Sequence, residues 1–177
     1  WLSIPIDVKG KFHQKINEAR VKDNKWSLDH WNKIVQNYKK APCFDEYSIH
    51  FKDLYTKQLC EYEYLSDINR VMLQKCIDLL DIEIKVLDSR EFDIRGGKTE
   101  KLINLCNDLE ANEYFTGPAA KGYMEEDLFE KNNIKLTYYD LDGFPTYKQL
   151  WDGFDHYVSI LDMFFILGSE TKEHFNW

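Results

Sequence analysis

The chain has 177 residues, of which 44% are hydrophobic and 31% charged, with only 8 glycines and 4 prolines. This composition is typical of a globular protein and excludes a disordered or fibrous chain. No segment approaches the ~20 consecutive apolar residues that a membrane-spanning helix needs. The formal charge of −8 argues against sequence-independent binding of nucleic acid. We therefore expect no membrane span and no nucleic-acid partner, although a local basic site stays open.

The first six residues, Trp1 to Ile6, alternate like the middle of a strand. Natural chains rarely begin inside a secondary-structure element. We therefore expect the sequence to be a single α/β domain over residues 1–177 that lacks an N-terminal βα segment.

The four cysteines, at positions 43, 60, 76 and 106, form no C-x-x-C pair and no zinc-binding pattern with histidine. Cys76 and Cys106 fall on the apolar faces of predicted helices, where a thiol acts as a small hydrophobic group. Reduced, structural thiols fit the cytoplasm best, and this is the expected location.

The first half of the chain is predicted to be mainly helical. Its expected elements are strands over 1–6 and 15–21, a helix capped by Ser27, and helices over 45–57 and 66–80. The helix after Ser27 carries an apolar stripe at helical spacing from Trp31 to Tyr38, and Ala41-Pro42 ends it.

The second half alternates between strands and helices. Its expected elements are strands over 82–86, 113–116 and 134–138, helices beginning near Lys98 and Pro118, and a long helix after Tyr147 that packs across the sheet. This β-α-β-α-β order favours a parallel sheet with right-handed crossovers. The predicted fold class is therefore a three-layer α/β fold with a mainly parallel sheet and a helical subregion in the first half.

Ligands of open parallel sheets bind where the strands end, so the loops after the predicted strands hold the candidate binding residues. These residues are Ser89, Arg90, Thr116, Gly117, Pro118, Lys121, Asp140 and Asp142, joined by Lys98 and Thr99 at a helix start. A helix start offers unpaired N–H groups and partial positive charge, and both attract phosphate. Two such starts, each with a lysine, predict a phosphate-binding edge.

Each of these signals has a plainer interpretation. Gly96-Gly97-Lys98-Thr99 resembles the end of a P-loop, but position 92 is Phe where that motif requires glycine. An ordinary capped helix with a solvated lysine explains the segment equally well. Asp140 and Asp142 could bind ribose hydroxyls or a metal, but Asp142-Gly143 is also a good turn dipeptide.

Histidine is the candidate general base, because it titrates near neutral pH. His30 and His156 both fit, and His30 is preferred, although a structural histidine is the commoner outcome for each. The H-E-x-x-H and G-x-S-x-G motifs do not occur, which disfavours zinc and serine hydrolases. No pattern predicts a resident metal or identifies a cofactor.

Five motifs together resemble the WbqC-like protein family, in the same order and over nearly the whole chain. They are Trp1-Leu2-Ser3-Ile4-Pro5 with Ile16-Asn17-Glu18, His30-Trp31-x-x-Ile34-x-x-Asn37-Tyr38-x-x-Ala41-Pro42, Lys98-Thr99-x-x-Leu102, Tyr114-Phe115-Thr116-Gly117-Pro118-Ala119-Ala120-Lys121-x-Tyr123 and Ser159-Ile160-Leu161-Asp162. Members of this family carry some further residues in front of the first motif, which agrees with the expectation of a missing N-terminal segment.

The resemblance implies a transferase of surface-polysaccharide (O-antigen, lipopolysaccharide) biosynthesis, which moves glycine or another acyl group onto the amine of a nucleotide-linked amino sugar. In that hypothesis His30 deprotonates the amine, the backbone at Gly117 to Ala119 stabilises the oxyanion, and Asp140 or Asp142 holds the ribose. Tyrosines such as Tyr123, Tyr138 or Tyr139 face the pyranose.

Two other functions stay open. The chain could be a non-catalytic module that binds a nucleotide sugar or contacts other enzymes of the same pathway. It could also be a nucleotidyl-transfer enzyme, which would need a divalent metal near Asp140 or Asp142.

Overall fold

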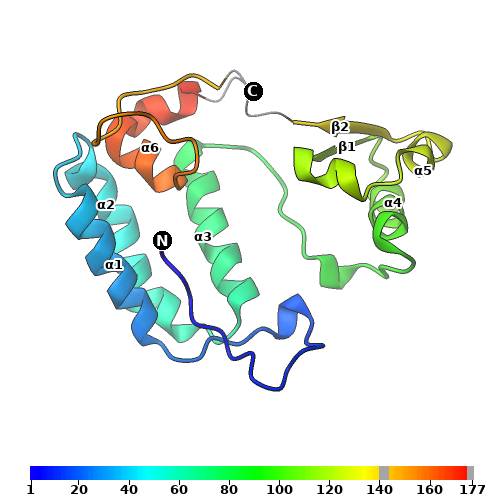
Figure 1. The fold of residues 1–177 in the computed structure, drawn as a ribbon, viewed down its shortest axis with the longest axis horizontal. Helices are drawn as coiled ribbons and strands as arrows, with labels where there is room; N and C mark the ends of the chain where they lie inside the picture. Colours follow the sequence, from blue (N-terminus) through cyan, green and yellow to red (C-terminus); the bar gives the residue numbers. More distant parts are fainter. Residues whose placement is uncertain (140–143, 175–177) are drawn as a thin grey trace. The chain divides into compact units, whose positions relative to one another are not determined.

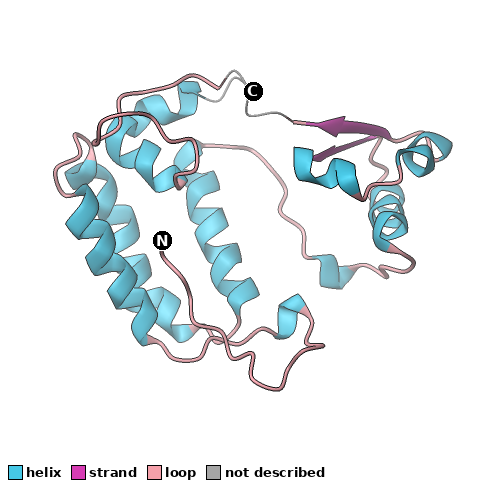
Figure 2. Cartoon of the chain, in the orientation of Figure 1, coloured by secondary structure: helices cyan, strands magenta, loops and turns pink. Residues whose placement is uncertain are grey.

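The computed structural model describes residues 1–139 and 144–174 (Figure 1). The chain divides into two compact units. We call Trp1–Ile84 with Pro145–Trp177 the helical unit, and Lys85–Phe144 the strand unit. Helices and a small parallel sheet together make a mixed α/β fold, as the sequence predicts in outline (Figure 2). The single domain expected over residues 1–177 stays a prediction.

The strands predicted over 1–6 and 15–21 are wrong, because this segment forms only isolated bridges, Ile6 with Val21 and Arg20 with Tyr64. Pro5 has no N–H to donate to a ladder. The Glu18 carboxylate accepts the N–H of Lys15 at 2.9 Å and folds Ile16–Glu18 into a 3-10 turn. A local side-chain contact therefore replaces the pairing that an extended strand would need.

Three predicted helices of the first half are confirmed. They are α1 (Lys25–Tyr38), α2 (Phe44–Asp53) and α3 (Leu65–Leu80). A π-helical turn, Leu54–Gln58, and a 3-10 turn, Leu59–Glu61, follow α2 directly. Ser27 does not cap α1, since the helix begins two residues earlier and Ser27 lies buried within it.

The long helix predicted after Tyr147 is largely wrong. Residues 145–159 are irregular, and α6 covers only Ile160–Leu167, followed by a 3-10 segment Gly168–His174. The side chain of Gln149 bonds both the N–H and the carbonyl of Asp155, at 2.9 and 3.0 Å. These bonds, and Gly153 at φ +91°, hold the segment in a loop instead of a helix.

The apolar side chains of α6, which we expected to pack across the sheet, pack among the helices of their own unit. The Phe165 ring lies 5.1 Å from the Phe44 ring and 5.3 Å from the Tyr38 ring. Trp151, in the irregular segment before α6, is 73% exposed. The buried aromatic side chains of this core are Trp26, Trp31, Phe44, Tyr47, Phe51, Tyr55, Phe164 and Phe165.

In the described part of the strand unit, β1 (Glu113–Thr116) and β2 (Lys135–Tyr138) form a parallel pair, with α4 (Lys98–Asp108) and α5 (Glu126–Lys131) beside it (Figure 1). The strand predicted over 82–86 is wrong: these residues are irregular, and Ile84 is 62% exposed. The helix predicted at Pro118 is a 3-10 turn, Pro118–Gly122. The three-layer βαβαβ arrangement is therefore not confirmed.

A buried carboxylate connects the irregular segment 145–159 to helices α1 and α6. Asp162 of α6 is 5% exposed and accepts the Tyr147 hydroxyl at 2.7 Å. Asp162 also accepts a hydrogen bond from the hydroxyl of Tyr38 in α1. Burial and these bonds raise the pKa of both tyrosines, which keeps their hydroxyls protonated as donors. Three separated segments therefore meet at one acceptor.

Replacing Asp162 with Ala should lower the free energy of unfolding by about 2–4 kcal/mol, because two hydroxyls would lose their acceptor. Asp162→Asn keeps one acceptor oxygen and should cost less. Urea unfolding measures both, with Asp152→Ala in the exposed loop as the control. Equal stability of Asp162→Ala and the control would contradict this role.

Candidate active site

The carboxyl ends of β1 and β2 meet in register, with Thr116 opposite Tyr138. The pairing of the two segments continues just past this edge, since the Tyr139 N–H donates to the Thr116 carbonyl at 3.0 Å. A Cβ on Gly117 would lie 3.1 Å from the Tyr139 hydroxyl oxygen, so glycine lets the tyrosine approach the backbone closely. The two strands thus bring residues 116–117 and 138–139 together.

A cation, a carboxylate and aromatic rings gather at this edge. The Lys121 ammonium lies 5.2 Å from the centre of the Tyr138 ring, and the Tyr138 hydroxyl donates to Glu126 at 2.9 Å. Loss of hydration and this bond raise the pKa of Tyr138. Tyr123 is 56% exposed. We call the set the strand-end cluster: Thr116, Gly117, Lys121, Tyr123, Glu126, Tyr138 and Tyr139.

Four substrate-binding residues predicted from the sequence lie in this cluster, namely Thr116, Gly117, Lys121 and Tyr123. Sequence analysis missed Glu126. It follows Glu125 in a run of acidic residues, and nothing in the sequence marks which of the two reaches Tyr138.

The start of α4 is less suited to a phosphate than its sequence suggests. The Gly97 N–H donates to the carboxylate of Glu100 at 2.6 Å, so an acidic side chain of the helix itself occupies this position. Thr99 is fully buried, and its hydroxyl accepts the Glu125 N–H at 3.3 Å. Lys98 is exposed. Thr99 therefore joins the starts of α4 and α5 and does not face solvent.

The remaining binding candidates lie elsewhere. Ser89 begins the 3-10 turn Ser89–Glu91, beside the paired side chains of Asp88 and Arg90. The strand that would have carried Ser89 to the sheet edge does not form, which removes the reason for placing it there. Asp140 and Asp142 lie outside the described residues.

His30, the predicted base, has the surroundings of a core histidine. It is 5% exposed, its Nε2–H donates to the Ser3 carbonyl at 3.1 Å, and its ring meets Trp26 edge to face at 5.0 Å. Burial lowers the pKa of His30 below its usual 6.5. A substrate amine has little access to this imidazole, and its catalytic role stays a prediction. His156 is exposed in the irregular loop.

Other catalytic chemistry has little support in the part of the chain that the structure describes. No group of three or more metal-binding side chains occurs there. All four cysteines are free thiols, and burial raises the pKa of Cys76 to about 11, as expected for an unreactive thiol.

A family model described as the WbqC-like protein family matches residues 1–174. The chain belongs to this family. It is 37% identical to the uncharacterized protein Rv1507c of Mycobacterium tuberculosis over 177 residues, which is all of this chain and 76% of that protein. No solved structure matches the chain. Among residues 1–139 and 144–174, no helix is long and apolar enough to cross a membrane.

The structure also connects two motifs of the WbqC-like resemblance that are distant in sequence. Tyr38 comes from the motif that begins at His30, and Asp162 ends the last motif. They meet through the hydrogen bond between α1 and α6. Part of the family pattern therefore maintains the helical unit, while the motif that ends at Tyr123 contributes to the strand-end cluster.

The burial of His30 gives stability a testable pH dependence. With its pKa lowered in the folded chain, the neutral imidazole stabilises the fold above pH 6.5, and this contribution is lost as the pH falls through 6.5 and below. We expect the free energy of unfolding to fall between pH 7.5 and 5.5, and to fall less in His30→Gln. Denaturant unfolding at several pH values tests this, with exposed His156→Gln as the control. If stability depended on pH equally in His30→Gln and in the unmodified chain, the His30 imidazole would be hydrated in the folded state, which would contradict its burial.

The buried position of Thr99 separates a structural role from ligand binding. Thr99→Val should cost about 1–2 kcal/mol of stability, because the Glu125 N–H loses its acceptor. Thr99→Ser keeps the hydroxyl and should cost less, while exposed Lys98→Ala should change stability by about 0.5 kcal/mol or less. Thermal and urea unfolding give these values. If Thr99→Val were as stable as Lys98→Ala, the bond would be unimportant.

Proposed function

We propose that the chain is a cytoplasmic transferase of surface-polysaccharide biosynthesis, and that it transfers glycine or another acyl group to the amine of a nucleotide-linked amino sugar. One observation carries the proposal: the Lys121 ammonium, the Glu126 carboxylate and the exposed ring of Tyr123 gather where two parallel strands end. This edge is the usual ligand position in open parallel sheets.

The chemistry of such a substrate fits the strand-end cluster. Lys121 supplies a positive charge for the diphosphate, and the described residues give it no carboxylate partner that would neutralise it. Exposed Tyr123 and Tyr139 offer ring faces to the pyranose. Glu126, already bonded to Tyr138, can accept a hydrogen bond from a sugar hydroxyl or amine.

In the proposed reaction the sugar amine attacks the activated carbonyl of the donor. The C–N bond forms, the donor's carrier group leaves with the electron pair of the broken bond, and the amine loses a proton to a base. Glu126 is the carboxylate of the cluster and the candidate for that proton. The N–H groups of Gly117 and Ala119 are candidate oxyanion donors, since Pro118 has none.

The second candidate is a non-catalytic module that binds the same nucleotide sugar and contacts other enzymes of the pathway. The position of His30 favours this module, because His30 is the histidine that the sequence analysis preferred as the base, and it is buried and bonded to Ser3. Turnover separates the two: acyl transfer by the isolated chain supports the transferase, and tight binding without transfer supports the module.

Replacing Lys121 with Ala should weaken binding of the nucleotide-linked amino sugar at least tenfold, about 1.4 kcal/mol, because the diphosphate loses its cation. A panel of UDP-, dTDP- and GDP-linked amino sugars, with and without magnesium, first identifies the ligand by thermal shift. A ligand at 100 times its Kd should stabilise the fold by about 2.7 kcal/mol. Calorimetry then compares the variants.

Lys131→Ala, at the exposed end of α5, is the matched control and should bind like the unmodified chain. An unchanged affinity of Lys121→Ala would remove the strand-end cluster from the binding site. Absence of any thermal shift in a folded chain would reject nucleotide-sugar binding. Strict dependence on magnesium would instead favour nucleotidyl transfer.

A further inference from the structure

A second polar site lies in the helical unit, within a segment whose charge is opposite to that of the chain. Residues 9–22 hold five lysines and arginines against the single carboxylate of Glu18, a net charge of +4. Since the whole chain carries −8, the other residues carry −12. Positive charge is therefore concentrated in one short segment.

This segment surrounds an open hollow of about 480 Å³, lined by Gly10, Lys11, Phe12, His13, Gln14, Glu18 and Arg20. Two successive turns form its rim, with the Lys11 N–H donating to Val8 and the Gln14 N–H donating to Lys11, both at 3.1 Å. Gly10 has φ +73°, a conformation that glycine adopts without strain. The volume suits a small ligand.

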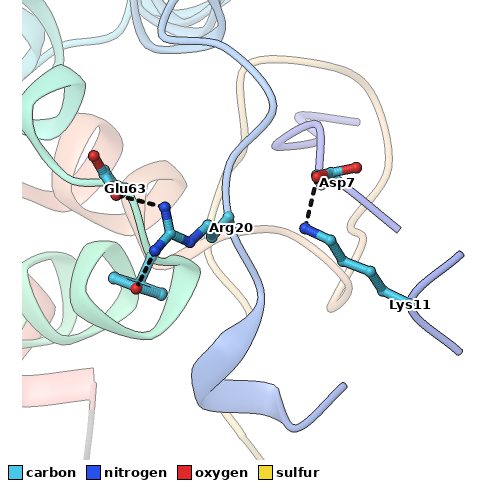
Figure 3. A network of polar contacts seen from close by, with 5 residues as sticks. Asp7, Lys11, Arg20 and Glu63 are labelled. Carbon is cyan, nitrogen blue, oxygen red and sulfur yellow. Dashed lines mark hydrogen bonds and ion pairs between the residues drawn. The ribbon is translucent and has the colours of Figure 1, made fainter. Parts of the chain in front are cut away.

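Two cations of the hollow are held in exposed, weak ion pairs (Figure 3). Lys11 contacts Asp7 at 2.7 Å, and Arg20 contacts Glu63 at 3.0 Å. Such surface pairs contribute little, so a ligand with two negative charges can compete with the carboxylates. The one acid of the lining, Glu18, already accepts the Lys15 N–H.

Arg20 is positioned before any ligand arrives. Its guanidinium donates to the Tyr64 hydroxyl at 2.6 Å and lies 4.8 Å from the centre of the Tyr64 ring. The bonds to Tyr64 and Glu63 use two of its five N–H groups. A planar guanidinium held in this way suits bidentate binding of phosphate oxygens.

The hollow also offers an aromatic ring. The Phe12 side chain is 96% exposed, and its ring meets His13 edge to face at 5.6 Å. An exposed aromatic ring of this kind can stack on a nucleobase.

We propose that this hollow binds a nucleoside phosphate. The phosphates contact Lys11 and Arg20, and the base stacks on Phe12. The site goes beyond the proposed function, because none of its residues belongs to the strand-end cluster. A small ligand fits better than a nucleic acid, since the −12 charge of the other residues repels a long polyanion.

Calorimetry with ADP and UDP at low ionic strength tests the proposal directly. Phe12→Ala and Lys11→Gln should each weaken binding about tenfold. Both side chains are exposed enough for the fold to survive, whereas Arg20→Gln also breaks the contacts with Tyr64 and Glu63. Asp7→Asn should tighten binding severalfold, because Lys11 loses its competing carboxylate.

The matched controls come from the same segment. Ile16→Ala removes another exposed apolar side chain, and Lys15→Gln removes another exposed cation, yet neither residue lines the hollow. Both controls should bind ADP and UDP normally. Pyrophosphate and adenosine, tested separately, should each bind more weakly than ADP, because each makes only part of the contacts.

Several results would overturn the proposal: no binding of ADP or UDP, binding that Phe12→Ala and Lys11→Gln leave unchanged, or pyrophosphate that binds as tightly as ADP. Lys121→Ala distinguishes this site from the proposed function. If Lys121→Ala alone weakens ADP and UDP binding, these ligands occupy the strand-end cluster and the hollow is not a site. If Lys11→Gln and Phe12→Ala alone do so, the hollow binds them and the strand-end proposal must rest on the sugar.

Discussion

Two strands of four residues cannot persist in water without other elements packed on them, so the strand-end cluster depends on what covers β1 and β2. Tyr114 and Leu136 point from the two strands into a core that includes Phe129 of α5. At the start of the pair, Glu113 accepts both Lys135 and the Thr137 hydroxyl and fixes the parallel register. The geometry around Lys121 is a consequence of this register, because it brings Thr116 opposite Tyr138.

The sequence predicted elements well where many residues repeat one signal. α1 and α3 each present an apolar stripe over several turns, and the strand over 113–116 lies between clear turn signals. The prediction was wrong where the sequence pattern was short, or where local hydrogen bonds stabilise a different conformation. The alternation over 82–86 has three apolar positions and no partner strand among the described residues. The Gln149–Asp155 bonds outweigh the helical spacing of the residues between them. Such contacts cannot be recognised from periodicity.

For the candidate site, the sequence predicted which residues lie at the strand ends better than it predicted what each candidate residue does. The sequence correctly predicted that Gly117 and Lys121 lie near the end of the same strand pair, because the parallel arrangement of the strands alone determines which loops lie at that edge. Two of the other candidate residues differ from the prediction because their side chains are buried. Thr99 and His30 have residue types that suit phosphate binding and proton transfer, yet both side chains are enclosed and bonded to the backbone. Thr99 lies at the start of α4 and His30 in the second turn of α1, and the residue type alone does not tell an enclosed side chain from an exposed one at either position.

The two proposed sites hold their cations in a similar way, which bears on how an acidic chain can bind anions. Lys121 lies over the Tyr138 ring, and Arg20 lies over the Tyr64 ring. A ring face attracts a cation by about 0.5–1 kcal/mol at an exposed site without neutralising it. A carboxylate partner would leave no net charge for a phosphate. Arg20 and Lys11 have such partners and Lys121 has none among the described residues, so a ligand in the hollow competes with carboxylates for these two cations. Removal of Asp7 should therefore strengthen binding in the hollow, whereas the strand-end cluster has no corresponding carboxylate to remove from Lys121.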